Sequence, residues 1–526
     1  MKPYAVIAAY AFLALIIVPV FPHFVSPSET ARWLSDASLV EHHTFEVSRL
    51  LPIVGGAGED LAVLDDGRVY SNKAPGSALL TLPGYLLGRI IAGPPSAQSM
   101  RTQIDLMRIT GATIPLLLLA LLFVYLGREW QSERTTFVVW LLLFATPLFA
   151  YGFLLFSHAL VTMALFAAWV CLFGARPSRP QQPGVSPGCD ESRGGRDVRA
   201  PLAGALIGLA VACEYPIAIA AIVLVGALAS TRDWRRVARV IAGGAPFAIA
   251  LAIYHRVNFG SIWTTPYSFG RLKIYRQMVS GGFFGIHVPS PVRLLQILLD
   301  PGLGLLVFMP FLIFAIPALK SARARLAPAA WWSLVLVPAS ILLLYAGYEG
   351  WAGGWNVGPR YLMPVVPFLL APMLLRRRSN VETALAGFAA FAVALATLVF
   401  PFPPRELPFP WISLAVPLLA RGVIAPNVFH LIARPLAIAV PFCVVVAIAI
   451  AVMKRDTLYA VIGVLLAIVI GSQAGRLSPP PLMELERTYI DAVYFERADG
   501  PRVVFPPSLE RRRERDRALP PPPWPF

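Results

Sequence analysis

The chain has 526 residues, of which 57% are apolar and only 14% are charged. Because soluble globular proteins carry charge on about 25% of their residues, this composition excludes a soluble enzyme, a disordered chain and a disulfide-stapled secreted domain, and it predicts a polytopic membrane protein. The net charge of +16 suits basic loops beside anionic lipid headgroups. No nucleic-acid-binding motif accompanies this charge, so membrane lipids rather than nucleic acid are the expected partners.

Apolar runs long enough to cross a hydrocarbon core of roughly 30 Å recur along the chain. The first, at 4–21, is followed by Pro22 and His23 rather than by the small residues of a cleavage site, which favours an uncleaved span that starts in the cytoplasm. Basic clusters at Arg232–Arg239 and Arg376–Arg378 mark cytoplasmic ends of other spans. The pattern predicts an all-α polytopic membrane protein with about 11–13 transmembrane helices. The further runs lie at 75–92, 104–126, 136–152, 156–174, 202–229, 237–257, 302–319, 329–346, 361–375, 383–400, 436–453 and 457–472.

Three polar stretches divide or follow these runs. Residues 22–75 form a long acidic loop after the first span. Residues 175–200 are rich in Pro, Gly and Arg and predict a flexible cytoplasmic loop. Residues 476–526 form a polar tail that is rich in Pro and Arg, to which we assign no chemistry. We therefore expect one transmembrane domain over residues 1–475.

The loop of residues 22–75 contains eight of the 29 acidic side chains of the chain. Because the first span starts in the cytoplasm, this loop is expected to lie outside. The segment from Ser26 to Glu29, with a proline at its second position, is typical of a capped helix start and predicts an amphipathic helix at the membrane interface. Glu29, Arg32 and Asp36 would share one face of this helix. The two acids are functional carboxylates or, on geometry alone, a cap and a solvated charge paired with Arg32.

A lysine stands at the end of this loop. Lys73 lies two residues before Pro75, and an apolar run starts at once. A lysine at this position either extends to lipid phosphate at the membrane surface or binds the phosphate of a substrate, because the start of a helix favours anions.

Several short motifs follow this loop in a fixed order, so that the set covers most of residues 1–400. They are Phe156-Ser157-His158, Asn258-Phe259-Gly260-Ser261, Asp300-Pro301-Gly302-Leu303 with Met309-Pro310-Phe311, and GGWNVGPRYL at 353–362. Together with the acidic first loop and Lys73, this set resembles the GT-C superfamily of integral-membrane glycosyltransferases. That superfamily includes the protein O-mannosyltransferases and the bacterial transferases that add aminoarabinose to lipid A. The segment at 353–362 is the most specific part of the resemblance.

The resemblance implies a GT-C-type bundle in the bacterial inner membrane, with an active site that faces outside. Such enzymes transfer a sugar, with inversion, from a polyprenyl-phosphate carrier to an acceptor, which the sequence does not identify. A first-loop carboxylate serves as the base; Glu29 matches its position, and Asp36 is the next acid. Lys73 matches the lysine that binds the donor phosphate. Arg360 is the candidate for a second phosphate contact, because a planar guanidinium suits phosphate oxygens.

Many members of the superfamily carry two neighbouring acids in the first loop, whereas Glu29 stands alone. This difference leaves open which carboxylate is catalytic and whether a divalent cation, Mg2+ or Mn2+, is bound. Glu59-Asp60 and Asp65-Asp66 offer oxygen ligands to such a cation. They are otherwise turn residues, since the second pair precedes a glycine.

Ionisable groups within apolar segments are costly and mark functional cavities. Glu214 interrupts its apolar run directly before a tyrosine and a proline, which predicts a break into two short helices, and His158 opens another span. Each of the two is either a cavity residue or one half of an internal hydrogen-bonded pair. With Tyr215, Trp355 and Tyr361 they are expected to line the substrate cavity.

Two other functions stay open on the sequence. A transporter or flippase of lipid-linked sugars fits the many spans and the buried Glu214, although the chain lacks the internal repeat typical of transporters. A non-catalytic relative that only binds lipid carriers fits the missing second acid of the first loop.

Overall fold

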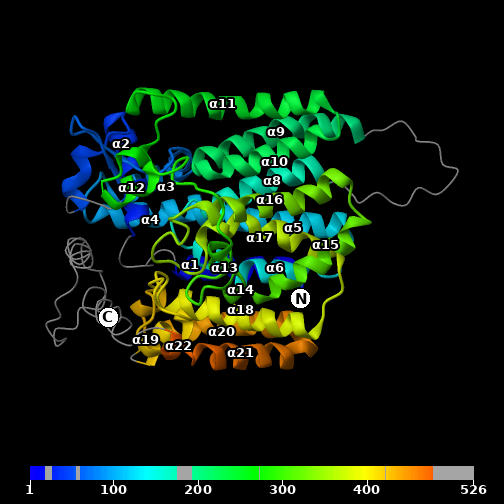
Figure 1. Ribbon diagram of the computed structural model, residues 1–526. Helices are drawn as coiled ribbons and strands as arrows, with labels where there is room; N and C mark the ends of the chain where they lie inside the picture. The colour runs from blue at the N-terminus through cyan, green and yellow to red at the C-terminus, as the bar shows by residue number, and fades with distance from the viewer. Residues whose placement is uncertain (18–25, 55–59, 175–191, 272, 421, 478–526) are drawn as a thin grey trace.

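The computed structural model describes residues 1–17, 26–54, 60–174, 192–271, 273–420 and 422–477. In this part of the chain nearly every element is a helix, and most of the long helices lie side by side in one bundle (Figure 1). The predicted all-α fold is confirmed. All but the first two residues of the predicted tail lie outside the described residues.

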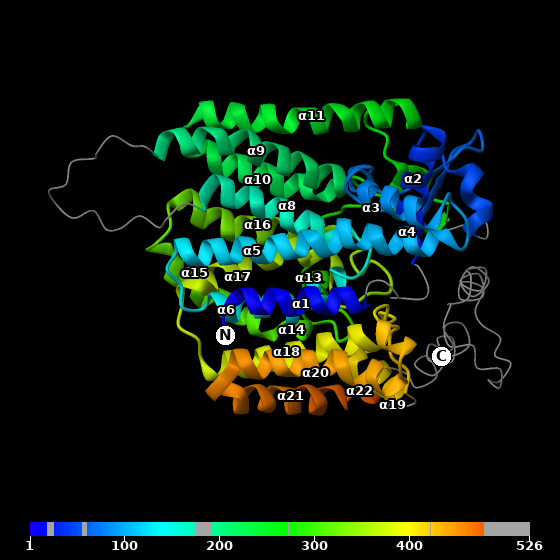
Figure 2. The ribbon, with the colours of Figure 1, turned by 180° about the vertical axis from the view of Figure 1, so that it is seen from behind.

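The first half of the bundle contains helices of very different lengths (Figure 2). They are α1 (Pro3–Ile17), α2 (Pro27–His42), α3 (Gly76–Ala92), α4 (Ser99–Arg108), α5 (Ile114–Glu129), α6 (Thr135–Phe144), α7 (Leu148–Tyr151), α8 (His158–Phe173), α9 (Ser192–Cys213), α10 (Ala218–Ala229) and α11 (Trp234–Phe259), with the 3-10 turn η4 (Tyr215–Ile217) between α9 and α10.

The second half contains shorter pieces and ends in a group of three neighbouring long helices, α18, α20 and α21. Its helices are α12 (Lys273–Ser280), α13 (Pro291–Leu299), α14 (Leu305–Phe308), α15 (Ala315–Arg323), α16 (Pro328–Gly347), α17 (Val366–Leu370), α18 (Asn380–Val399), α19 (Val416–Ala420), α20 (Arg434–Met453), α21 (Thr457–Gly471) and α22 (Ala474–Leu477). The 3-10 turns η6 (Pro310–Phe314), η7 (Arg360–Val365) and η8 (Ala371–Leu375) lie among them.

The bundle has two distinct ends (Figures 1 and 2). The loop end carries α2, α3, α12 and the start of α4. The N-terminal end carries Met1 and the starts of α11 and α18. The basic clusters Arg232–Arg239 and Arg376–Arg378 both belong to the N-terminal end, which is the distribution that the positive-inside rule predicts for a cytoplasmic side.

This is a multi-pass membrane protein. Among the described residues, five helical segments are long and apolar enough to cross a membrane, and eight shorter apolar helices accompany them. The number of segments that meet this length is below the predicted count of about 11–13 spans, because breaks shorten many of the apolar helices. The five segments are Ser99–Glu129, Trp234–Phe259, Pro328–Gly347, Asn380–Val399 and Arg434–Leu477, the last of which contains both α20 and α21.

Prolines break apolar runs that hydropathy alone would make continuous. The run at 302–319 is divided into α14, η6 and α15, because Pro310 has no N–H to donate to a helix. The prediction of one continuous span there is wrong. The run at 361–375 is likewise a series of the short pieces η7, α17 and η8, each containing a proline. The break predicted at Glu214 is confirmed, since α9 ends one residue before it.

Two predicted loops contain more regular structure than expected. α9 begins at Ser192, inside the loop predicted at 175–200, whose residues 175–191 lie outside the described part. In the first loop, β1 (Leu61–Val63) and β2 (Val69–Ser71) form an antiparallel hairpin that the sequence analysis missed. The turn predicted between them is confirmed: Gly67 has a φ of +86°, a conformation that favours glycine.

The helix predicted at the start of the first loop is α2, and its cap is as expected. The N–H of Glu29 donates to Ser26 Oγ at 3.3 Å, and the N–H of Ser26 donates to Glu29 Oε2 at 3.0 Å. The expectation of an amphipathic surface helix is wrong, because every residue from Ser28 to Ser38 is buried. α2 packs on α3 and α4 over a separate apolar core that includes Trp33. The charged side chains of α2 therefore lie inside the protein.

Candidate active site

Glu29 is bound from three sides inside the loop end. Its Oε1 accepts hydrogen bonds from Arg108 Nε at 2.9 Å and from the backbone N–H of Leu155 at 2.8 Å, while Oε2 caps α2 through Ser26. Arg108 also bonds Asp105 at 2.8 Å. Burial raises the pKa of Glu29, but Arg108 and the two backbone N–H groups outweigh it, so this pKa lies below its usual value. Glu29 is thus ionised, and both of its oxygens are occupied.

Arg32 connects α2 with α8 and with the break between α9 and α10. Its Nη2 donates to Ser157 Oγ at 2.9 Å and lies 3.7 Å from Glu214 Oε1, while the Ser157 hydroxyl donates to Glu214. The side chain of Arg32 is 3% exposed and that of Glu214 is 16% exposed. Glu214 is therefore one member of an ionic network that joins three elements of the loop end.

Asp36 lies on α2 without a cationic partner among the described residues. Its Oδ2 accepts a hydrogen bond from Thr81 of α3 at 2.5 Å, and its Oδ1 has no partner in that part of the chain. Burial raises the pKa of Asp36 well above its usual value, and the Thr81 hydroxyl and the charge of Arg32 offset this only in part. Asp36 thus favours its protonated form, and the surface ion pair with Arg32 that was one reading of the sequence is not formed.

Lys73 lies between β2 and α3 and pairs with a carboxylate of the same loop. Its Nζ is 3.0 Å from Asp60 Oδ1, and the Asn72 amide lies 3.4 Å from the same oxygen. Burial raises the pKa of Asp60, but Lys73, Arg360 and Asn72 lower it by more, so this pKa is below its usual value. The charge of Arg360 thus acts on Asp60. Lys73 therefore pairs with Asp60 directly, whereas Arg360 acts on the same carboxylate through its charge alone.

Arg360 begins η7, and aromatic rings hold its guanidinium. Its Cζ lies 4.8 Å from the ring centre of Tyr361 and 5.4 Å from that of Phe156, and its Nη2 donates to the Tyr361 hydroxyl at 3.1 Å. Gly353 has a φ of +70°, and a Cβ there would stand 2.5 Å from Nε of Arg360. That Nε has no hydrogen-bond partner in the described structure. The guanidinium is therefore fixed in direction and keeps one buried donor for a ligand.

His158 lies beside the same aromatic group. Its ring stacks on Phe156 at 5.8 Å between centroids and meets the edge of Tyr361 at 5.7 Å. The charges of Arg360, Arg32 and Lys73 all act on this imidazole. His158, Arg360 and Tyr361 thus lie in one cluster with Phe156, and the charge of Lys73 acts on it.

The other two predicted cavity residues lie in different surroundings. The hydroxyl of Tyr215 is 3.0 Å from Nε2 of His255 on α11. Trp355 is partly buried and packs against the main apolar core. Tyr215 therefore connects the polar residues of the site with α11, because it lies next to Glu214 in the chain and its hydroxyl faces His255.

The described residues do not provide a set of metal ligands. They contain no group of three His, Cys, Asp or Glu side chains that could hold an ion. Asp60 faces Lys73, and Asp66 accepts a 2.8 Å hydrogen bond from Arg68. Glu59 lies outside the described residues. This donor set does not fit Mg2+ or Mn2+, and no catalytic step is assigned to such a cation.

Sequence reasoning missed three members of this site. It treated Asp60 as a turn residue or a metal ligand, Arg32 only as a partner of Asp36, and it did not consider Arg108. A signal for Arg108 was present, because this arginine falls inside the apolar run predicted at 104–126. An ionisable residue within a span is a functional candidate by default.

Comparisons with known proteins support the fold. No protein-family model and no curated protein matches the chain. Among solved structures, the chain is similar to ArnT from Cupriavidus metallidurans bound to undecaprenyl phosphate, with 16% identity, coverage of 89% of this chain and 77% of that one, and a TM-score of 0.50. It is also similar to the oligosaccharyltransferase AglB from Archaeoglobus fulgidus in complex with an inhibitory peptide and a dolichol-phosphate. There the identity is 14%, the coverage 99% of this chain and 60% of that one, and the TM-score of 0.41 is too low to support an argument.

The fold is that of the GT-C membrane glycosyltransferases. Within that class, this chain resembles ArnT over most of the length of both proteins. The predicted resemblance is therefore confirmed at the level of the fold.

Proposed function

We propose that this protein is a membrane glycosyltransferase that moves a sugar from a polyprenyl-phosphate carrier to an acceptor hydroxyl, at the loop end of the bundle and on the outer side of the inner membrane. The observation that carries the proposal is that Lys73 pairs with Asp60 at 3.0 Å while the charge of Arg360 acts on the same carboxylate. The similar fold of ArnT, whose structure contains undecaprenyl phosphate, supports a lipid-phosphate donor.

Lys73 and Arg360 would bind the phosphate of the donor. The Lys73 ammonium is a compact charge, whereas Arg360 supplies a planar fork with a donor that no described protein group uses. Both cations are largely shielded from water, where charge-assisted hydrogen bonds are strong. When the bond between the sugar and the phosphate breaks, its electron pair goes to the phosphate oxygen. The two cations then stabilise the charge on the departing polyprenyl phosphate.

Asp60 is well placed to act as the base. A base must come within hydrogen-bond reach of the acceptor hydroxyl, and the side chain of Asp60 is 21% exposed, whereas Glu29 and Asp36 are 0% exposed. A bound phosphate would compete with Asp60 for Lys73, and weakening that pair raises the pKa of Asp60. Asp60 then takes the hydroxyl proton while the acceptor oxygen attacks the anomeric carbon opposite the phosphate. Glu29 and Asp36, the carboxylates predicted from the sequence, would position α2.

Binding of the carrier tests the phosphate site. Native mass spectrometry of the purified protein should show bound polyprenyl phosphate, and Lys73→Ala or Arg360→Ala should each lower its retention at least ~10-fold, the loss of one charge-assisted contact. Arg68→Ala is the matched control, because Arg68 belongs to the same hairpin but pairs with Asp66. Equal retention by all four proteins would contradict the phosphate site.

Transfer tests the base. In nanodiscs with polyprenyl-phosphate sugars, Asp60→Asn should lower kcat by about 10²- to 10⁴-fold, the usual contribution of a general base, while the carrier stays bound. Glu29→Gln should mainly lower the Tm, and its effect on kcat should be smaller than that of Asp60→Asn. Loss of transfer in Glu29→Gln at unchanged Tm, with full activity in Asp60→Asn, would reverse the two roles. Carrier binding without transfer of any sugar would identify a non-catalytic binder and overturn the enzymatic proposal.

A further inference from the structure

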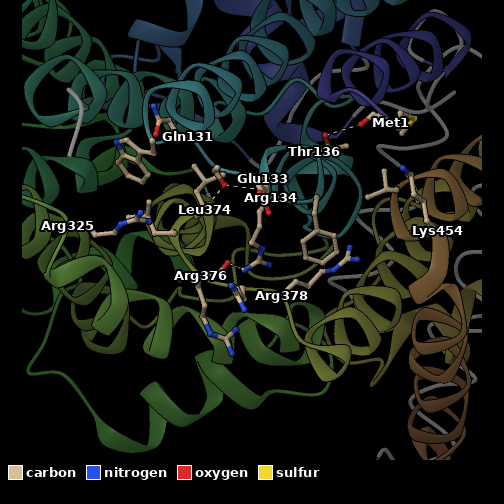
Figure 3. A pocket seen from close by; sticks show the side chains of 16 residues that line it. Met1, Gln131, Glu133, Arg134, Thr136, Arg325, Leu374, Arg376, Arg378 and Lys454 are labelled. Carbon is tan, nitrogen blue, oxygen red and sulfur yellow. Dashed lines mark hydrogen bonds between the residues drawn. The ribbon is translucent and has the colours of Figure 1, made fainter. Parts of the chain in front are cut away.

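A second polar site lies at the N-terminal end of the bundle, away from the cluster around Lys73. It is a cavity of about 710 Å3 between the α5–α6 connection, the end of α15, the segment before α18 and the end of α20 (Figure 3). Six cationic side chains line it, namely Arg134, Arg325, Arg376, Arg377, Arg378 and Lys454. Glu133, which is exposed, is the carboxylate among the lining residues. The cavity thus carries an excess of positive charge.

Carboxylates behind the lining neutralise only part of this charge. Glu382 is 0% exposed and binds Arg134 and Arg376, and Asp456 binds Arg378. The other three cations, Arg325, Arg377 and Lys454, are exposed and form no ion pair within the described chain. Three positive charges around one cavity repel one another, so an anion bound among them would be stabilised.

Two buried donors that line the cavity lack acceptors. Arg134 is 9% exposed, and its Nε has no hydrogen-bond partner in the described structure, although its other nitrogens bind Glu382 and backbone carbonyls. Trp130 is 3% exposed, and its Nε1 likewise has no partner there. Buried N–H groups without acceptors are rare in native proteins and cost free energy. An anion with several oxygens would supply the missing acceptors.

The wall of the cavity is apolar beside these donors. Trp130, Phe137, Leu375 and Val452 line it together with the cations. A small soluble anion needs no such wall, whereas the glycerol and acyl chain of a phospholipid would pack against it. Basic pockets between transmembrane helices on the cytoplasmic side suit anionic lipid headgroups, and the basic residues of this end favour the cytoplasmic side.

We propose that this cavity is a binding site for the phosphate headgroup of an anionic phospholipid of the cytoplasmic leaflet. The phosphate oxygens accept from Arg134 Nε and Trp130 Nε1, and the exposed cations Arg325, Arg377 and Lys454 stabilise its charge. The apolar wall receives the lipid chain. The site is separate from the proposed donor site and does not depend on its function.

Lipid binding to the delipidated full-length protein tests the site, with phosphatidylglycerol and phosphatidylcholine as probes. The variant Arg325→Gln/Arg377→Gln/Lys454→Gln should lower the affinity for phosphatidylglycerol at least ~10-fold, because it removes the three exposed cations that attract the anionic headgroup. The matched control is Arg232→Gln/Arg235→Gln/Lys320→Gln, which removes the same charge from exposed positions at the same end but outside the cavity. The control should change the affinity less than ~2-fold. Equal losses in both triple variants would show surface attraction only and overturn the site.

Two further measurements sharpen the result. Trp130→Phe removes one donor and keeps an aromatic ring, so it should weaken phosphatidylglycerol binding several-fold, by about the net value of one hydrogen bond, at a nearly unchanged Tm. sn-Glycerol 3-phosphate serves as a soluble probe and should bind far more weakly than the lipid. Comparable affinities for sn-glycerol 3-phosphate and phosphatidylglycerol would support a phosphate site but would contradict the proposal that its ligand is a lipid.

Discussion

At the loop end, Glu29 and Arg32 are buried against groups of opposite charge, whereas at the N-terminal end Arg325 and Arg377 are exposed and have no such partner in the described chain. Both ends contain a buried Arg–Glu pair, Arg108 with Glu29 and Arg134 with Glu382. Around the first pair the charges are balanced; around the second, cations are in excess.

This difference in charge balance indicates how each end can bind a phosphate. A buried charge is tolerated only when it is paired, so a ligand at the loop end must displace a protein carboxylate such as Asp60 from its cation. An exposed cation costs little to keep in water and is available to a ligand without any displacement. The loop end therefore favours binding that changes the state of a base, and the N-terminal end favours binding that leaves the ion pairs of the protein in place.

Breaking the buried pair at the loop end should have the largest effect. Arg108→Leu removes the cation that pairs with the buried carboxylates of Glu29 and Asp105. Because a buried charge without its partner is costly, we expect the free energy of unfolding to fall by about 3–5 kcal/mol. Thermal unfolding in detergent measures it. The double variant Arg108→Leu/Glu29→Gln should recover part of the loss, because it removes one unpaired charge. No recovery would show that packing rather than charge determines the cost.

The corresponding change at the N-terminal end should cost less. Glu382→Gln keeps a side-chain oxygen that accepts a hydrogen bond from Arg134, whereas Arg108→Leu removes every hydrogen bond of the cation, so we expect a smaller loss of about 1–3 kcal/mol. The same unfolding assay compares it with Arg108→Leu. A loss as large as that of Arg108→Leu would show that the two ends do not differ in how they tolerate charge.

The pKa of Asp36 predicts a pH dependence specific to the loop end. Because this pKa is raised in the folded protein, the stability that Asp36 contributes is fully present below the usual aspartate pKa of about 3.9 and is lost as the pH rises through the raised value. Asp36→Asn mimics the protonated form and should flatten the fall of Tm as the pH rises above the usual aspartate pKa. An unchanged slope would mean that Asp36 does not hold this proton.

The smallest effect should come from the exposed pair of the hairpin. Arg68 and Asp66 are each 50% exposed, and solvent screens such pairs. Arg68→Ala should leave the Tm unchanged within error and should leave carrier retention unchanged as well. A marked loss of stability would show that the hairpin contributes more to the loop end than its contacts indicate.

The sequence supplied candidate residues for the site but not the partners with which the structure pairs them. Capping residues predicted the start of α2, and the lysine before Pro75 marked Lys73 as a phosphate ligand. Glu29 stood out because it lies in an acidic loop, yet the structure shows an occupied carboxylate bonded to Arg108, which lies 79 residues further along the chain. Hydropathy likewise cannot distinguish α2 as a surface helix from α2 as a buried one, because its partners lie in α3 and α4.

Local chemistry, read from the sequence by itself, determined the all-α membrane fold, the break at Glu214 and the turn at Gly67. These follow from hydropathy, proline and capping, which act within a few residues. Only the tertiary structure decided that Asp60 pairs with Lys73 and is affected by the charge of Arg360, and that segments far apart in the chain form one basic cavity at the opposite end. Which buried charges pair depends on their burial and on their distance in space, and the spacing of residues along the chain determines neither.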